Sequence, residues 1–114
     1  MGAPAIGAVV LVPFPFSDLS QTKLRPAVVL ANAGRGDSVL CQVTSNAYVD
    51  PLATELPAAD FAHGSLQRTS YARPGKLFTA NDTLVVRQIG MLTPAARTRI
   101  VATVVKLLER AVRK

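Results

Sequence analysis

The sequence predicts a mainly β domain with a C-terminal α-helix, arranged as a small antiparallel barrel. Two observations carry this prediction. Short β-rich apolar runs separated by turn residues recur between residues 9 and 92. A stretch with helical periodicity follows, beginning at Pro94. The length of 114 residues is typical of one domain, and we expect residues 1–114 to form a single one.

Five or six short strands are expected, and each is bounded by turn residues. Two prolines, with Ser and Asp, mark a loop over residues 13–23, and Gly34–Asp37 forms a turn between two strands. The expected strands are residues 9–12, 26–32, 38–45, 53–56, one or two within 66–80 bent near Arg73-Pro74-Gly75, and one within 83–92.

The C-terminal helix has a clear start and an apolar face. Thr93 is placed to cap the helix, and Pro94 suits its first position. The apolar residues that recur at helical spacing are Ile100, Val104, Leu107, Leu108 and Ala111. We therefore expect the helix to pack on the barrel.

Composition points to an anionic partner and a reducing compartment. The net charge is +6, and nine of the 13 basic residues are arginine, which suits bidentate phosphate contacts. Nucleic acid or an acidic protein would fit this charge. The single cysteine, Cys41, excludes an intrachain disulfide and fits the cytoplasm. The longest apolar stretch, Ile6–Phe16, is broken by prolines and too short to span a membrane.

Arg25 stands at the mouth of an apolar strand and directly before Pro26. Proline disfavours the α region for the preceding residue, so Arg25 is held extended. Pro26 lacks an N–H and belongs at the start or edge of a strand. Arg25 is therefore expected at the rim of the sheet, where its charge need not be buried.

A hairpin around Gly34–Asp37 would set a hydroxyl or an amide across from this arginine. Paired residue numbers would sum to about 69 to 71, depending on the turn type. Arg25 would then face Thr44, Ser45 or Asn46. A guanidinium and a hydroxyl at one sheet end suit a phosphodiester, because the guanidinium can oppose developing negative charge. The alternative is structural, with Arg25 bonded to strand-end carbonyls.

Further side chains are candidates to bind a nucleic acid, because basic residues interleaved with aromatics can hold a backbone and stack bases. At least one of Phe14 and Phe16 is instead expected to fill the core. The expected RNA contacts are Phe16, Asp18, Lys23, Ser45, Arg68, Tyr71, Arg73 and Lys76.

The sequence resembles the MazF/PemK family of bacterial toxins over nearly its whole length. The matching stretches, in order, are "GAVVLVPFPFSD", "KLRPAVVL", "CQVTS", "SYARPGKLFT" and "QIGML". The resemblance implies an SH3-like or plug-type barrel, a homodimer and a cognate acidic, MazE-like antitoxin. It also implies an endoribonuclease that needs no metal or cofactor and cleaves single-stranded RNA at short sequences. In such enzymes the 2′-hydroxyl attacks the adjacent phosphate, leaving a 2′,3′-cyclic phosphate and a 5′-hydroxyl.

The resemblance implies that Arg25 and Thr44 are the catalytic residues. It leaves the general base open, because a guanidinium keeps its proton. Asp18 is a candidate by position only, and solvent is the alternative. Many relatives carry an acidic residue where this chain has Ala8, and some use a histidine, whereas His63 here is expected to be a solvated loop residue.

Two other functions are compatible with the same features. One is a barrel that binds nucleic acid without cutting it. The other is a CcdB-like toxin, which has the same barrel and poisons gyrase. The stretches "KLRPAVVL" and "QVTS" favour the ribonuclease.

Overall fold

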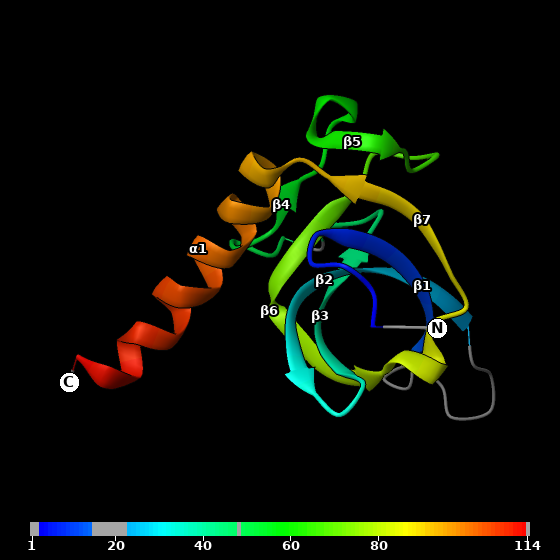
Figure 1. The fold of residues 1–114 in the computed structure, drawn as a ribbon. Coiled ribbons are helices and arrows are strands. Elements are labelled where there is room, and N and C mark those ends of the chain that lie inside the picture. The colour runs from blue at the N-terminus through cyan, green and yellow to red at the C-terminus, as the bar shows by residue number, and fades with distance from the viewer. Residues whose placement is uncertain (1–2, 15–22, 48, 114) are drawn as a thin grey trace.

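The fold is seen in a computed structural model that describes residues 3–14, 23–47 and 49–113. Figure 1 shows a strongly curled sheet with a long helix extending from its side. The strands are β1 (Ala8–Phe14), β2 (Lys23–Gly34), β3 (Asp37–Thr44), β4 (Thr54–Glu55), β5 (Phe61–Gly64), β6 (Tyr71–Asn81) and β7 (Arg87–Leu92). The helix α1 is Pro94–Val112, and two 3₁₀ turns are Ala58–Asp60 and Asp82–Leu84.

The described strands form one antiparallel sheet in the order β4-β6-β3-β2-β1-β7-β5. The predicted mainly β antiparallel barrel with a C-terminal helix is confirmed, in the form of a curled half-barrel. Its edges are the two shortest strands, β4 and β5. Strand β5 has the sequence FAHG, which lacks apolar alternation, so the sequence did not predict it.

The hairpin between β2 and β3 turns where the sequence predicts it. Arg35 and Gly36 form its two-residue tip, with φ angles of 57° and 79°. Positive φ at both central residues is the geometry of a type I′ turn, whose twist matches the flanking strands. The hairpin is therefore closed at its tip, and its open ends lie at the opposite end of these two central strands.

Strand β6 is continuous but strongly bent. Its pairing with β3 shifts between Cys41–Leu77 and Val43–Ala72, so two steps along β3 correspond to five along β6. The extra residues, 73–76, include the proline and glycine of the predicted bend. That prediction is confirmed, with a single strand on both sides of the bend.

The core has two apolar clusters because the strands bury side chains on both faces. Val9 and Val28 pack in the cluster that includes Ile100 of α1. Their neighbours Val10 and Val29 pack in the second cluster with Phe14 and other residues of the sheet. Burial on both faces explains why β1 and β2 are continuous apolar runs and do not alternate.

The fully buried residues of the helix lie in its first half. Thr93 caps it as predicted, its Oγ1 accepting the Ala96 N–H at 3.2 Å, and Ala96 and Ile100 are buried. Leu108, by contrast, is 60% exposed, and Figure 1 shows the end of α1 projecting away from the sheet. The expected packing of Leu108 and Ala111 is therefore wrong. Within the described residues, no helix is long and apolar enough to cross a membrane.

Candidate nucleic-acid interface

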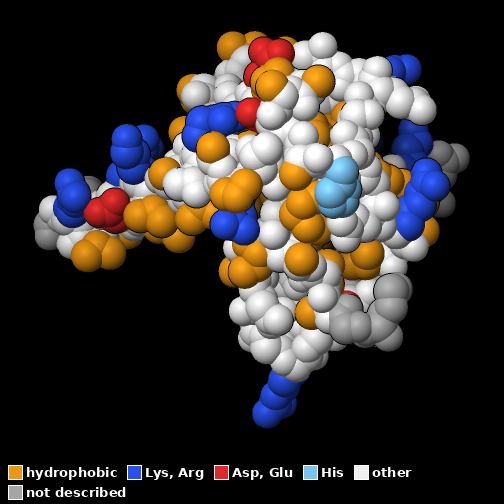
Figure 2. Space-filling model, turned by 45° about the horizontal axis from the view of Figure 1, so that its top comes forward, with side chains coloured by type: hydrophobic (Ala, Val, Ile, Leu, Met, Phe, Trp, Pro, Cys, Tyr) orange, Lys and Arg blue, Asp and Glu red, His pale blue; other side chains and the backbone are white. Residues whose placement is uncertain are grey.

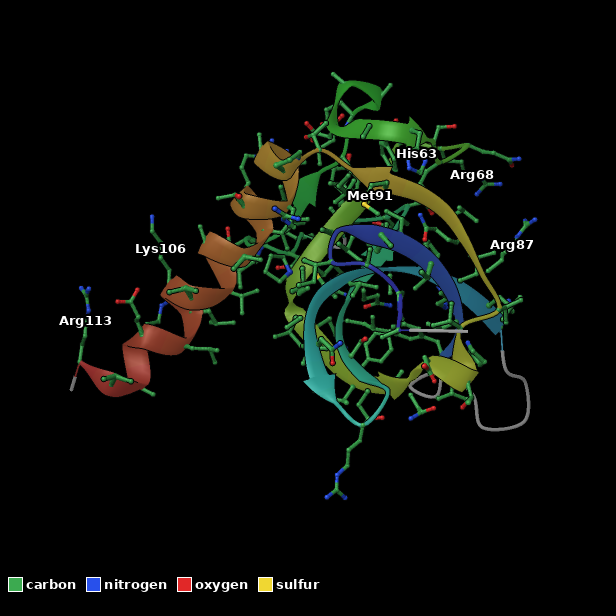
Figure 3. All side chains as sticks on the ribbon, in the orientation of Figure 1. His63, Arg68, Arg87, Met91, Lys106 and Arg113 are labelled. Atoms are coloured by element: carbon green, nitrogen blue, oxygen red, sulfur yellow. The ribbon has the colours of Figure 1, made fainter. Side chains whose placement is uncertain are left out.

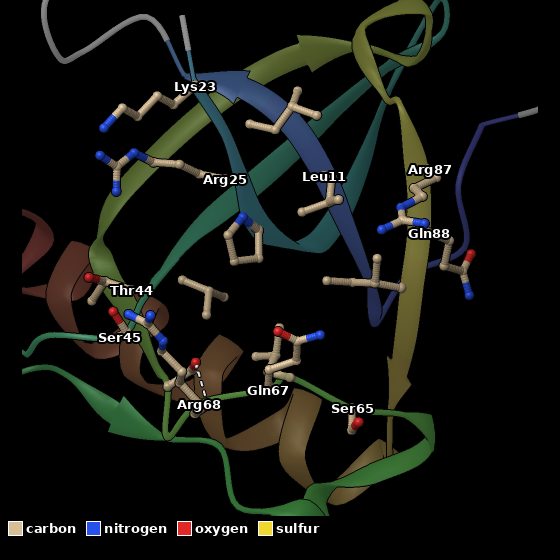
Figure 4. Close-up of a pocket in the computed structure, with 16 residues that line it drawn as sticks. Leu11, Lys23, Arg25, Thr44, Ser45, Ser65, Gln67, Arg68, Arg87 and Gln88 are labelled. Carbon is tan, nitrogen blue, oxygen red and sulfur yellow. Dashed lines mark hydrogen bonds between the residues drawn. The ribbon is translucent and has the colours of Figure 1, made fainter.

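An open groove of about 820 Å³ lies at one end of the curled sheet. Strands β1, β2, β3 and β7 contribute to it, together with the connection over residues 65–70 (Figure 4). Its volume falls within the range of ligand-binding clefts. Its lining includes the apolar residues Leu11, Pro26, Val43, Leu66 and Ile89, which we call the apolar floor.

The groove is cationic. Lys23, Arg25, Arg68 and Arg87 line it, and no described lining residue is acidic. Within the described part of the chain, these four side chains form neither an ion pair nor a hydrogen bond. Charges without a partner inside a cleft create a field that attracts an anion. Figure 3 shows Arg68 and Arg87 extending to the same side of the molecule.

Arg25 is held at this groove by its strand. Arg25 pairs with Val12 of β1 and Pro26 pairs with Leu11, so the Arg25–Pro26 pair lies within regular sheet. The side chain of Arg25 is only partly exposed. It thus combines a backbone stiffened by proline with a charge that reaches solvent.

The register of the hairpin bears on which residue lies across from Arg25. Near the groove, Val28 pairs with Cys41 and Ala27 with Gln42, so the paired numbers sum to 69. The pairing of β2 with β3 ends at Ala27, and the same sum continued by two residues would match Arg25 with Thr44. Of the three partners that the sequence left open, this continuation favours the threonine, and both residues line the groove.

The hydroxyl of Thr44 is oriented by the backbone that follows it. Thr44 ends β3 and is 7% exposed, and its Oγ1 accepts the backbone N–H of Asn46 at 3.2 Å. Because this bond uses a lone pair, the hydroxyl proton stays available for donation. Thr44 is thus a positioned donor at the rim of the groove.

Three of the predicted RNA contacts line the groove. Lys23, Ser45 and Arg68 lie with Arg25 and Thr44 along one wall, as Figure 4 shows. Arg68 belongs to the connection between β5 and β6, which is fixed when the hydroxyl of Ser70 donates to the Arg68 carbonyl at 2.9 Å. Residues from three separate parts of the sequence therefore meet at one wall.

The other predicted contacts lie elsewhere. Tyr71 pairs with Thr44 on the neighbouring strand but does not line the groove, and Lys76 is exposed on the bend of β6. Arg73 also lies outside the groove, and its Nε donates to Asp50 Oδ2 at 2.9 Å. Phe16 and Asp18 lie outside the described residues.

The ion pair of Arg73 with Asp50 is mostly shielded from water. The two side chains are only 18% and 12% exposed. The hydrogen bond from Arg73 lowers the pKa of the Asp50 carboxyl, and the Leu52 backbone N–H, which donates to the same carboxylate, lowers it further. Asp50 lies in the chain that leaves β3 after Thr44, so the pair ties this chain to the bend of β6.

Sequence reasoning missed several polar residues that line the groove, among them Gln67 and Arg87. Arg87 reaches it because β7 pairs with β1, which places Arg87 beside Leu11. No local pattern connects positions so far apart in the chain. Gln67 follows β5, which the sequence did not predict. Gly64, at φ 74°, ends that strand, and a Cβ there would overlap the Ile89 carbonyl oxygen. In the sequence, the only signal for this strand end and its connection was a glycine followed by a polar stretch.

Other candidate groups are not near the groove. Ala8 is fully buried, and it lies four residues from Val12, the partner of Arg25, which is about 13 Å of strand. A side chain at position 8 therefore has no direct contact with Arg25. His63 is exposed on β5 and does not line the groove (Figure 2). Its predicted exposure is confirmed, but it lies in a strand and not in a loop.

Neither a thiolate nor a metal cluster is available among the described side chains. Cys41 is fully buried as predicted, and burial raises the pKa of its thiol to about 12. At neutral pH this sulfur is therefore not a nucleophile. Among the described residues, no group of three or more His, Cys, Asp or Glu side chains could hold a metal ion.

The fold is that of MazF toxins. MazF (Form-I) from Deinococcus radiodurans superposes with a TM-score of 0.72 at 23% identity, over 95% of this chain and 98% of that one. The MazE-MazF complex (Form-III) from the same organism gives 0.73 at 21%, over 93% and 96%. An endoribonuclease in complex with its cognate antitoxin from Mycobacterial species gives 0.70 at 19%, over 95% of each chain.

Family membership rests on sequence. Residues 5–108 match the family described as PemK-like, MazF-like toxin of type II toxin-antitoxin system. The protein belongs to this family, as the resemblance in the sequence predicted. No curated protein sequence matches the chain.

Proposed function

We propose that the protein is a cytoplasmic endoribonuclease toxin that cleaves single-stranded RNA at short sequences. The observation that carries the proposal is that Arg25 and Thr44 line the same groove, whose described residues include four cations and no acid. Membership in the toxin family supports the same conclusion. A phosphodiester backbone supplies the anion that the groove lacks.

The proposed reaction is an internal transesterification. The 2′-oxygen attacks the adjacent phosphorus, and the bond from phosphorus to the 5′-oxygen breaks. The products are a 2′,3′-cyclic phosphate and a 5′-hydroxyl. The 2′-hydroxyl loses one proton and the leaving 5′-oxygen gains one, so the step balances without a further reactant.

Arg25 and Thr44 have different roles at the phosphate. The guanidinium of Arg25 opposes the negative charge that develops on the phosphoryl oxygens. Thr44 donates its hydroxyl proton to the same group, while its Oγ1 accepts the Asn46 backbone N–H. Lys23, Ser45 and Arg68 hold the neighbouring backbone along the same wall.

The groove offers no side-chain base among its described residues, because none of them is a carboxylate or a histidine. Asp18 and solvent are therefore the two candidates for the proton acceptor. A pH-rate profile that is unchanged in Asp18→Asn would assign the step to solvent. Tyr71, Arg73 and Lys76 lie away from the groove, and of these we assign Arg73 a positioning role through Asp50.

We propose a homodimer formed through the projecting part of α1. Val105, Leu108 and Val112 are 48%, 60% and 82% exposed and lie on one face of the helix. Figure 2 shows hydrophobic side chains along this projection, beside basic ones. Sedimentation analysis should give a dimer for the native chain and a monomer for Leu108→Glu. A native monomer would contradict the proposal.

We propose that an acidic antitoxin is a second partner and that it would bind the same groove. A segment rich in Asp and Glu would neutralise the four cations that RNA otherwise contacts, so it would compete with RNA. One solved neighbour is a complex with its cognate antitoxin. Co-expression of an adjacent small acidic protein is expected to relieve growth arrest by this chain.

Incubation of the purified protein with single-stranded RNA in EDTA tests the activity. Cleavage with cyclic-phosphate ends is expected, and a substrate with 2′-deoxyribose at the cleavage position should resist. No cleavage, or full cleavage by Arg25→Ala, would contradict the proposal. Retained RNA binding without cleavage would favour a binding barrel, and gyrase binding without an effect on RNA would favour a CcdB-like toxin.

A further inference from the structure

The groove contains a neutral amide between two charged regions. Gln67 lines the groove, and its side chain is exposed. In Figure 4 its amide points into the groove from the connection between β5 and β6. Within the described residues it forms no hydrogen bond. Both its donor and its acceptor are therefore available to a ligand.

The charges on the two sides of Gln67 suggest where a backbone would run. Arg25 and Arg68 lie with Thr44 and Ser45 on one side of the groove, and Arg87 points inward from the opposite side (Figure 4). Cations at both walls can contact successive phosphates of one strand. The base between two such phosphates would then lie over the apolar floor, facing Gln67.

The chemistry of the floor suits a base better than a phosphate. Leu11, Pro26 and Ile89 supply an apolar surface on which a base can rest. A neutral amide adds no charge that would attract a phosphate, but it offers a donor and an acceptor side by side. In nucleic-acid recognition, a glutamine amide pairs with adenine, donating to N7 and accepting from the N6 amino group.

We propose that Gln67 is a specificity-determining residue that recognises an adenine next to the scissile phosphate. This inference rests on the proposed ribonuclease function and deepens it. Arg25 and Thr44 supply the chemistry, which any sequence could undergo. Gln67 supplies the hydrogen bonds that restrict it to certain sequences.

Gln88 provides a matched control. It is a second exposed glutamine at the rim of the same groove, but its side chain points away from the groove in Figure 4. Replacing Gln88 removes the same chemical group without removing an amide from the floor. A further amide, Gln42, does not line the groove; it is half-buried, and its carbonyl oxygen is buried without a partner among the described residues.

The experiment maps the cleavage ends on a random RNA library for the native chain, Gln67→Ala, Gln67→Met and Gln88→Ala. The native chain is expected to require adenine at one position beside the cut. Both Gln67 variants should lose about 5- to 150-fold of the discrimination at that position, while keeping the other preferences. Gln67→Met keeps the length of the side chain, so a loss in both variants identifies the hydrogen bonds. Gln88→Ala should retain the native pattern.

A modified substrate tests the contact itself. Replacing that adenine by 7-deazaadenine removes the N7 acceptor, and should slow the native chain roughly 2- to 10-fold. The same replacement should have no further effect on Gln67→Ala. Native preferences in both Gln67 variants, a required base other than adenine, or equal losses in Gln88→Ala would overturn the inference. Absence of any RNA cleavage would overturn the proposed function, and the role of Gln67 with it.

Discussion

Two arginines in this chain precede a proline, and the structure gives them opposite surroundings. Arg25-Pro26 lies in regular pairing of β2 with β1, and Arg25 lines a groove without an acidic partner among the described residues. Arg73-Pro74 lies at the bend of β6, where Arg73 is bonded to Asp50 and Pro74 is fully buried. The same dipeptide thus serves a surface site in one strand and internal structure in another.

The difference lies in what the rest of the fold brings to each guanidinium. In both cases proline holds the preceding residue extended, which is a local effect. Asp50 reaches Arg73 from 23 positions away, along the chain that follows Thr44. No described carboxylate reaches the groove. Local sequence therefore fixes the direction of an arginine, and a distant residue decides whether its charge is already neutralised.

The contrast between the two arginines predicts its largest effect at Arg25. Arg25→Ala should lower the rate of RNA cleavage by about 100- to 1000-fold, because one charge-stabilising donor is removed. Its unfolding free energy should change by less than about 0.5 kcal/mol, since no described partner is lost. Single-turnover kinetics and chemical denaturation measure the two quantities. A large loss of stability would show that Arg25 is structural, like Arg73.

The reverse pattern is expected at Arg73. Arg73→Ala should lower the unfolding free energy by about 1–3 kcal/mol, because the shielded Asp50 carboxylate loses its partner. The matched control is Arg99→Ala, which breaks the pair with Asp60. Because Arg99 is 47% exposed, that change should cost less than about 1 kcal/mol. Equal effects of the two substitutions would contradict the structural role of Arg73.

The pH dependence of stability distinguishes the two sites further. The pKa of Asp50 is lowered in the folded state, from an ordinary value of 3.8. Its stabilisation is therefore fully present above about pH 4 and is lost as the pH falls through the lower, folded pKa. Denaturation curves should show a constant gap between the native chain and Asp50→Asn near neutral pH, which closes in acid. A gap that persists in acid would exclude the ion pair as its source.

The smallest expected effect concerns the prolines themselves. Pro26→Ala should cost about 0.4–1 kcal/mol, mainly because the unfolded chain gains freedom. Pro74→Ala should cost more, because the buried ring also leaves a cavity at the bend. Thermal unfolding of the two variants, measured side by side, compares them. A greater loss for Pro26→Ala would mean that the groove end depends on its proline more than the bend does.

Much of the candidate site could be predicted from the sequence, because its central pair belongs to one hairpin. The turn at Gly34–Asp37 restricts the partner of Arg25 to three consecutive residues. Choosing among them required the register, which two irregularities near the tip shift before it reaches the groove. The packing of α1 was predicted less well, since helical spacing shows a face but not how far the barrel extends beneath it.

The sequence by itself determined most of the secondary structure, though not β5, and the extended rim position of Arg25, because turns, prolines and apolar runs act over a few residues. Only the tertiary structure decided which charges face the groove. Arg87 and Gln67 reach it through pairings of β7 and β5 that no local pattern specifies. Arg73 does not line the groove, and its charge is paired with Asp50. The physical reason is that a charge is neutralised by whichever group the fold brings within bonding distance, and sequence separation does not limit that choice.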